Sequence, residues 1–251
     1  LADILVFDDL MKLKPKKIFV GGMLVLSNGT IVSKIKKHPV PKWMTKTVKL
    51  NKFTEDNFLI KSHSDLVDVN VIDMKTEIIT KKGHETLSVK DENIIPSYDK
   101  DVWKVAAFDR TFGSTKHAVG FLKNFGPRIG AFASTWSFHE NNMIVIGSNE
   151  KDMAIAANNL LRTQGGMVVV YKGKILSSMP LQMAGIMSTD SFEKTSKNFS
   201  DINNMLLDSG CKFKKPHLIP LFLPFLALPE IRILHQGIID VKSRSFLKTI
   251  V

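Results

Sequence analysis

Hydrophobic and polar residues alternate along much of the first ninety residues, and this pattern predicts β-strands. A short apolar strand is expected at residues 4–7. The segment 17–26 holds two apolar runs separated by Gly21 and Gly22. Both glycines accept a positive φ angle, so this segment predicts a β-hairpin. Alternation returns at residues 65–73, which indicates a strand with one buried face.

The pattern changes after the polar segment 90–101. We therefore expect a β-rich region over residues 1–92 and a second domain over residues 93–251. Apolar runs in the second domain predict further strands, and those without polar interruption are typical of strands covered on both faces. The expected strands are 103–109, 117–122, 130–135, 142–147, 167–171 and a short one ending near 175.

One amphipathic helix is expected between two of these strands, over residues 149–164. Ser148 or Asn149 is suited to its N-cap, and a left-handed glycine at 165 or 166 to its end. A strand, a helix and a strand in about thirty residues predict a βαβ unit with a right-handed crossover. The strands 142–147 and 167–171 should therefore be parallel and lie in one sheet.

A second helix is expected to begin near Asp190, where Glu193 has the spacing of a capping box, and to end at Gly210. The apolar stretch after this helix is interrupted by prolines. A last strand is expected at residues 231–241. The elements together predict a mixed α/β or α+β fold, in which helices cover a mixed β-sheet.

Composition narrows the class of protein. A single cysteine, Cys211, excludes an internal disulfide and favours a reducing, cytoplasmic location. No apolar stretch approaches the ~20 residues of a membrane span. The net charge of +11 arises partly from lysine clusters at 12–17, 34–37 and 212–215. These clusters are short and contain few aromatic residues for base stacking, so they indicate a solvated surface rather than a nucleic-acid interface.

The histidines do not have the spacing of a metal site. No two of the seven lie two or four residues apart, the spacings that let one strand or helix present two imidazoles. The single cysteine also excludes the zinc site of base deaminases with a PCxxC motif. The seven are His38, His63, His84, His117, His139, His217 and His235.

Polar residues concentrate in the segment 134–142, STWSFHENN. His139 and Glu140 are the candidates for a general base or for binding an exocyclic amine. On a regular strand they would point to opposite faces, so an irregular backbone is needed to aim both at one substrate. The alternative is that the polar groups satisfy local backbone groups, with Trp136 and Phe138 in the core. Further candidates near a substrate are Ser134, Thr135 and Asn142.

An ordered series of segments resembles the adenine deaminases of the amidohydrolase superfamily, in the part that follows their catalytic barrel. LADILVFDD and PKKIFVGGMLV are similar to the chain that leaves the barrel for a small β-sandwich. VNVIDMKTEIITKK (69–82) resembles the link into the C-terminal domain. Further segments resemble that C-terminal domain and occur in the same order as in the family. They are KVAAFDR, AVGFLKNFG, GAFAST, IVIGSNEKDMAIAANNLL, QGGMVVVYKGKI, PLQMAGIMS, FLALPEIR and GIIDV.

The resemblance implies a function that needs residues outside this chain. Adenine deaminases hydrolyse adenine to hypoxanthine and ammonia with a metal-activated water. Their divalent metal, Mn or Fe, is held by the barrel, beginning with an HxH motif. The resemblance thus implies that this chain packs on its own N-terminal barrel, holds no metal itself, is inactive alone, and belongs to a homo-oligomer such as a dimer. A small β-sandwich remnant should precede its C-terminal domain.

The segment 134–142 departs from the pattern of that family, which is close to STVAHDSHN. Phe138 and Asn141 stand at the two histidines, His139 stands at the aspartate, and Asn142 agrees. A family role for the histidines therefore does not transfer to Phe138 or Asn141. The first hypothesis is a C-terminal region that packs on the barrel and closes its active site. The alternative is a stand-alone binding module without catalysis.

Overall fold

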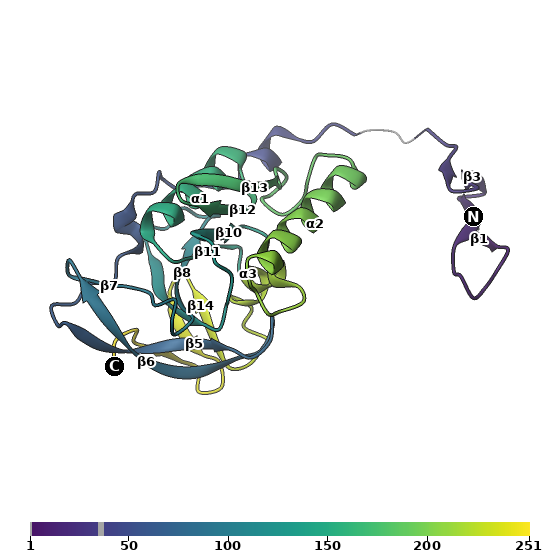
Figure 1. Ribbon diagram of the computed structural model, residues 1–251. Helices are drawn as coiled ribbons and strands as arrows, with labels where there is room; N and C mark the ends of the chain where they lie inside the picture. Colours follow the sequence, from purple (N-terminus) through teal and green to yellow (C-terminus); the bar gives the residue numbers. More distant parts are fainter. Residues whose placement is uncertain (1, 35–37) are drawn as a thin grey trace. The chain divides into compact units, whose positions relative to one another are not determined.

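A computed structural model describes residues 2–34 and 38–251 of the chain (Figure 1). Contacts group the chain into two compact units, Leu1–Pro39 and Val40–Val251. Most of the lysine cluster at 34–37 lies outside the described residues. The domain boundary expected between residues 92 and 93 stays a prediction.

The first unit contains a four-stranded antiparallel sheet in the order β1-β2-β3-β4. The predicted hairpin is confirmed, because β2 and β3 pair across Gly21 and Gly22, whose φ angles are 57° and 80°. The strand expected at residues 4–7 is also present. The strands are β1 Ile4–Phe7, β2 Pro15–Val20, β3 Met23–Ser27 and β4 Thr30–Ile31.

The second unit is built on a nine-stranded sheet with the order β13-β12-β10-β11-β8-β9-β5-β6-β7. Neighbouring strands are antiparallel except β5 and β9, which are parallel, so the predicted mixed sheet is confirmed. The strands are β5 Leu66–Met74, β6 Thr80–Lys90, β7 Asn93–Ile94, β8 Val102–Asp109, β9 His117–Lys123, β10 Ala131–Ser134, β11 Asn142–Gly147, β12 Gly166–Tyr171 and β13 Lys174–Pro180.

The two long helices cover opposite faces of this sheet (Figure 1). Alternate residues of β8 enter different cores: Val105 packs in the core that includes α2, and Ala106 in the core that includes α1. This alternation follows from the two-residue period of a strand. Because both faces are covered, every residue of β8 is buried. The helices are α1 Glu150–Thr163 and α2 Phe192–Asp208.

The strand–helix–strand prediction is confirmed. β11 and β12 both pair antiparallel with β10, which lies between them, so they are parallel and in one sheet. Asn149 is the N-cap of α1, and its side chain accepts a hydrogen bond from the amide of Asp152. The left-handed residue that ends α1 is Gln164, with a φ of 57°, rather than a glycine. The glutamine also donates to the carbonyl of Leu161, which helps to hold the turn.

The second helix is confirmed close to its expected bounds, but its capping residue and the last strand differ from the prediction. α2 begins after Ser191, whose hydroxyl accepts from the amide of Lys194, so Asp190 is not the N-cap. The single strand expected at 231–241 is a hairpin of β14 Ile231–Leu234 and β15 Gly237–Asp240, in which Leu234 pairs with Gly237 and the chain reverses at residues 235 and 236. A third strand, β16 Ser245–Leu247, pairs with β15. The short helices are η1 Lys42–Thr45, η2 Glu55–Phe58, η3 Pro216–Leu218 and α3 Ile219–Phe222.

A buried ion pair joins the sheet to the first turn of α1. The Nζ atom of Lys104 on β8 lies 2.5 Å from the Oε1 atom of Glu150, and the lysine side chain is 0% exposed. The ammonium also donates to the Oδ1 atom of Asn93 at 2.7 Å and to the carbonyl of Phe58 at 3.0 Å. Burial lowers the pKa of Lys104, and the contact with Glu150 acts in the opposite direction. The lysine thus connects four separate segments.

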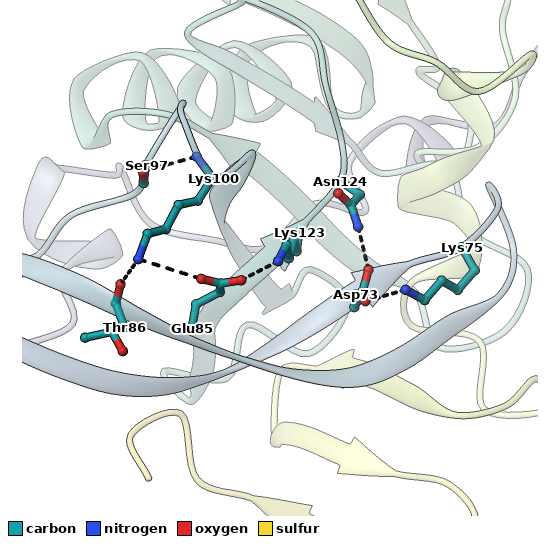
Figure 2. Close-up of polar contacts among 8 residues, drawn as sticks. All are labelled: Asp73, Lys75, Glu85, Thr86, Ser97, Lys100, Lys123 and Asn124. Carbon is teal, nitrogen blue, oxygen red and sulfur yellow. Dashed lines mark hydrogen bonds and ion pairs between the residues drawn. The ribbon is translucent and has the colours of Figure 1, made fainter.

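Charged side chains also connect the β5–β6 ribbon to its neighbours (Figure 2). Glu85 on β6 pairs with Lys123 on β9 and lies 3.8 Å from the Nζ atom of Lys100. Asp73 on β5 accepts from Asn124 at 2.7 Å and pairs with Lys75, just past the end of that strand. The hydrogen bond to Glu85 raises the pKa of Lys123. These pairs fix the position of a ribbon whose outer strand is largely polar.

Candidate functional site

The segment singled out by the sequence forms a loop at one end of the large sheet. β10 and β11 are antiparallel neighbours, and residues 135–141 connect them. Asn141 has a φ of 53°, so the backbone is irregular immediately before β11. The side chain of His139 is 86% exposed, whereas that of Glu140 is 10% exposed. The two adjacent candidates therefore face different surroundings.

Thr135 fixes the start of this loop. Its side chain is fully buried, and its hydroxyl donates to the carbonyl of Gly185 at 2.7 Å. The same hydroxyl accepts from the amide of Gly166 at 2.8 Å. A methyl group in place of the hydroxyl would leave both backbone groups without this partner. Thr135 therefore connects the loop to β12 and to the turn around Gly185.

The other small polar residues of the segment are also buried and bonded to backbone. The hydroxyl of Ser134 accepts from the amide of Trp136, and that of Ser137 accepts from the amide of Asn141. Asn142 donates to the carbonyl of Glu140 at 2.9 Å and accepts from the amide of His235 at 2.8 Å. These contacts agree with the expectation that such side chains would satisfy local backbone groups. These hydrogen bonds hold the backbone of the loop in one conformation from its buried side.

Glu140 reaches away from the loop toward the segment after α3. Its Oε1 atom accepts from the amide of Leu226 at 3.2 Å and lies 3.9 Å from the Nδ1 atom of His139. Its Oε2 atom is buried and has no hydrogen-bond partner among the described residues. A buried polar atom without a partner costs about 1–3 kcal/mol, so this oxygen has unused capacity to accept a hydrogen bond.

Arg110 is a site residue that the sequence analysis missed. It follows β8 directly and is 2% exposed. Its guanidinium donates to the Oδ1 atom of Asn141 at 3.1 Å and to the carbonyl of Ala184 at 3.0 Å. Burial lowers its pKa to about 10, with Asp109 acting against that shift. The only signal in the sequence was a charged pair, Asp109 and Arg110, at the end of an apolar strand.

The two aromatic residues of the loop have different roles. Trp136 packs edge-on against Phe199 of α2 with 5.1 Å between ring centroids, as expected of a core residue. Phe138 is 57% exposed, so the expectation that it lies in the core is wrong. One side of its ring rests on Phe222 and Phe225 at 5.4 and 5.5 Å, and the rest faces outward.

His217 packs against Trp136 and Phe199, and its burial predicts that acid lowers the stability of the protein. Burial, together with the charge of Lys215, lowers its pKa from 6.5 to about 4. The unfolded chain therefore takes up a proton as the pH falls from 6.5 toward 4, whereas the folded chain does not. Stability that is present above pH 6.5 is lost across this window.

We expect this histidine to remove about 2–3 kcal/mol of stability between pH 7 and pH 4.5. Urea denaturation at both values should show a smaller loss in His217→Asn, whose amide can still contact Asn203. His139→Asn is the matched control, because His139 is exposed. An equal loss in the wild type and in His217→Asn would contradict this assignment.

The described residues contain no group of three or more His, Cys, Asp or Glu side chains placed to hold a metal ion. The residues present here therefore do not fit a metal centre. Across residues 2–34 and 38–251, no helix combines the length and apolar character needed to cross a membrane.

Comparison with known proteins shows which family this chain resembles. Residues 77–245 match the adenine deaminase C-terminal domain. An adenine deaminase of Cenarchaeum symbiosum (strain A) is 49% identical over 252 residues, which cover 100% of this chain and 41% of the relative. An adenine deaminase of Clostridium botulinum (strain Langeland / NCTC 10281 / Type F) is 33% identical over 253 residues, with 42% of it covered. One from Staphylothermus marinus (strain ATCC 43588 / DSM 3639 / JCM 9404 / F1) is 30% identical over 255 residues.

The match has two consequences. The chain spans about two fifths of the length of these relatives. The stand-alone module is not favoured, because the whole chain is similar to one part of longer adenine deaminases. The chain belongs to the adenine deaminase C-terminal domain family.

Proposed function

We propose that this chain is the C-terminal region of an enzyme that hydrolyses adenine to hypoxanthine and ammonia. Family membership and the similarity to enzymes named adenine deaminase support the reaction. The purine would bind mainly in the part of the protein that precedes this chain, an amidohydrolase barrel. A homo-oligomer, such as a dimer, and a cytoplasmic location belong to the same proposal. The location is supported by the single cysteine.

The role of this chain in that reaction is to close the active site with the loop 135–141. The observation that carries this role is the exposure of His139 on a loop whose base is held by buried hydrogen bonds. Glu140 lies beside it, and one oxygen of its carboxylate has no hydrogen-bond partner in the described part of the chain. A neutral imidazole or a carboxylate can accept a hydrogen bond from an exocyclic amine or a proton from water. His139 is therefore the proposed contact with substrate, and Glu140, whose side chain is 10% exposed, is proposed to act beside it through the imidazole 3.9 Å away.

Ser134, Thr135 and Asn142 are assigned a positioning role instead of contact with substrate. Each is buried, and the polar atoms described above bind backbone groups of this chain. The divalent metal, Mn or Fe, would be held by residues outside this chain, because the described residues offer no cluster for it.

Substitution of the two loop residues tests this proposal in the complete protein. We expect His139→Ala and Glu140→Ala each to lower kcat for adenine by at least about tenfold, equivalent to ~1.4 kcal/mol of barrier, without a change in folding. The measurement is steady-state hypoxanthine formation together with a thermal unfolding curve.

A second histidine supplies the matched control. His63 is also 86% exposed and lies 3.4 Å from a carboxylate oxygen of Glu92. His63→Ala should leave kcat unchanged, because nothing connects it to the loop. Wild-type kcat in both His139→Ala and Glu140→Ala would leave residues 135–141 as a structural connection only.

A further inference from the structure

Three large aromatic side chains are exposed on the loops around the candidate site. Trp43 on η1 is 73% exposed and Phe112 after β8 is 87% exposed. Phe138 on the loop 135–141 is 57% exposed. Single exposed apolar residues are common, but a group of aromatic residues on neighbouring loops marks a surface that binds another part or molecule. We call these three residues the aromatic face.

Hydrogen bonds through Arg110 join the loops that carry this face. The guanidinium donates to Asn141 on the loop of Phe138 and to the carbonyl of Ala184. The amide of Ala184 donates in turn to the carbonyl of Met44, next to Trp43, at 2.7 Å. Phe112 is two residues from Arg110 in the chain. The three aromatic residues are therefore held by one connected set of contacts, which lets them act as one surface.

The surroundings of Trp43 indicate the chemistry of the partner. Trp43 lines a cavity of about 550 Å³, and its lining contains three lysines and no acidic residue. The hydroxyl of Thr47, another lining residue, is buried and has no hydrogen-bond partner among the described residues. A partner that fits would present an apolar surface with acidic groups at its edge. The lining is formed by Lys42, Trp43, Lys46, Thr47, Lys49 and Thr111.

We propose that the aromatic face is the surface on which the preceding, catalytic part of the same polypeptide docks. This inference rests on the proposed function, and it adds Trp43 and Phe112 to the contact made by the loop 135–141. The length of the relatives points to this occupant. This chain spans only about two fifths of them, so in the relatives a part larger than this chain is available to cover the face. The face also includes the loop proposed to close the active site.

Hydroxyl-radical footprinting of the complete protein tests the docking surface. Oxidation of each aromatic residue is measured by mass spectrometry, first in the complete protein and then in this 251-residue chain. We expect Trp43, Phe112 and Phe138 to react several-fold more slowly in the complete protein than in the chain. Phe192 and Phe246, which are 82% and 61% exposed, are internal controls and should react equally in both.

The possible results separate the occupants. Equal reactivity of the aromatic face in both proteins would overturn the proposal. Protection that disappears when the complete protein is diluted to a monomer would identify a second copy as the occupant and would also overturn it. Slow oxidation of the aromatic face already in the 251-residue chain would mean that residues 1–39 or a second copy of the chain cover it. That result would also overturn the proposal. Adenine is absent throughout, so the result is independent of the proposed activity.

Discussion

Replacing Glu150 with alanine is expected to lower the free energy of unfolding by about 3–5 kcal/mol, because it leaves a buried charge on Lys104 without its counter-ion. The lysine ammonium is 0% exposed, and its other partners are neutral oxygens of Asn93 and Phe58. Burial acts to raise the pKa of Glu150, but hydrogen bonds from Lys104 and Asn93 outweigh it and lower that pKa, which favours the charged carboxylate. Urea denaturation at pH 7 measures the loss.

Two variants distinguish the buried charge from a general effect of helix position. Glu193 occupies the first turn of α2 as Glu150 occupies that of α1, but it is exposed, so Glu193→Ala should unfold as the wild type does. The double variant Lys104→Met with Glu150→Leu should recover most of the loss, because it removes both charges. A Glu150→Ala protein as stable as Glu193→Ala would contradict the assignment of a buried ion pair.

Thr135→Val should cost about 2–4 kcal/mol, since it leaves the buried amide of Gly166 and the carbonyl of Gly185 without a partner. The substitution keeps the shape of the side chain and removes only the hydroxyl. The change should also loosen the loop 135–141, because Thr135 is the residue that connects it to β12. Chemical denaturation measures the first effect, and faster hydrogen exchange at the amides of 136–141 reports the second.

Thr135→Ser is the matched control, because serine retains the hydroxyl that donates to Gly185 and accepts from Gly166. It should keep most of the wild-type stability and the slow exchange of the loop. If valine and serine gave equal losses, the missing methyl or a packing change would explain them, and the hydrogen-bond role of Thr135 would be wrong.

Most of the strands and helices could be predicted from the sequence, because the hydrophobic periodicity and the turn residues indicate the same element boundaries. The apolar runs that became β8, β10, β11 and β12 are bounded by polar residues or glycine, so they could be located as strands. The path between β11 and β12 was also predictable, because a well-capped helix joins them. The place of β10 in the sheet, between β11 and β12, could not be predicted, since the pairing of strands depends on contacts distant in sequence.

The long strand β6 was missed for a physical reason. Much of Thr80–Lys90 is polar and exposed, and only Thr80 and Leu87 are buried. Such a strand is specified by pairing with β5 and by contacts such as that of Glu85 with Lys123 (Figure 2) more than by its own hydrophobic pattern. Local periodicity therefore gave no signal for it.

The candidate site was located by sequence but its internal arrangement was not. Both interpretations of the segment 134–142 describe part of it: the small polar residues bind backbone, and His139 is exposed. The sequence could not reveal Arg110 as a site residue. It lies more than twenty residues earlier and is brought to the loop only when the chain folds. It also could not reveal that Glu140 turns inward, because that direction depends on the amide of Leu226.

Adenine turnover by the complete protein tests the central proposal most directly. The polypeptide that contains this chain and its preceding region is purified with Mn or Fe, and hypoxanthine and ammonia are measured together. We expect equal amounts of both products from adenine, and none from the 251-residue chain under the same conditions. A complete, folded protein that leaves adenine unchanged, or a 251-residue chain that deaminates it unaided, would contradict the account.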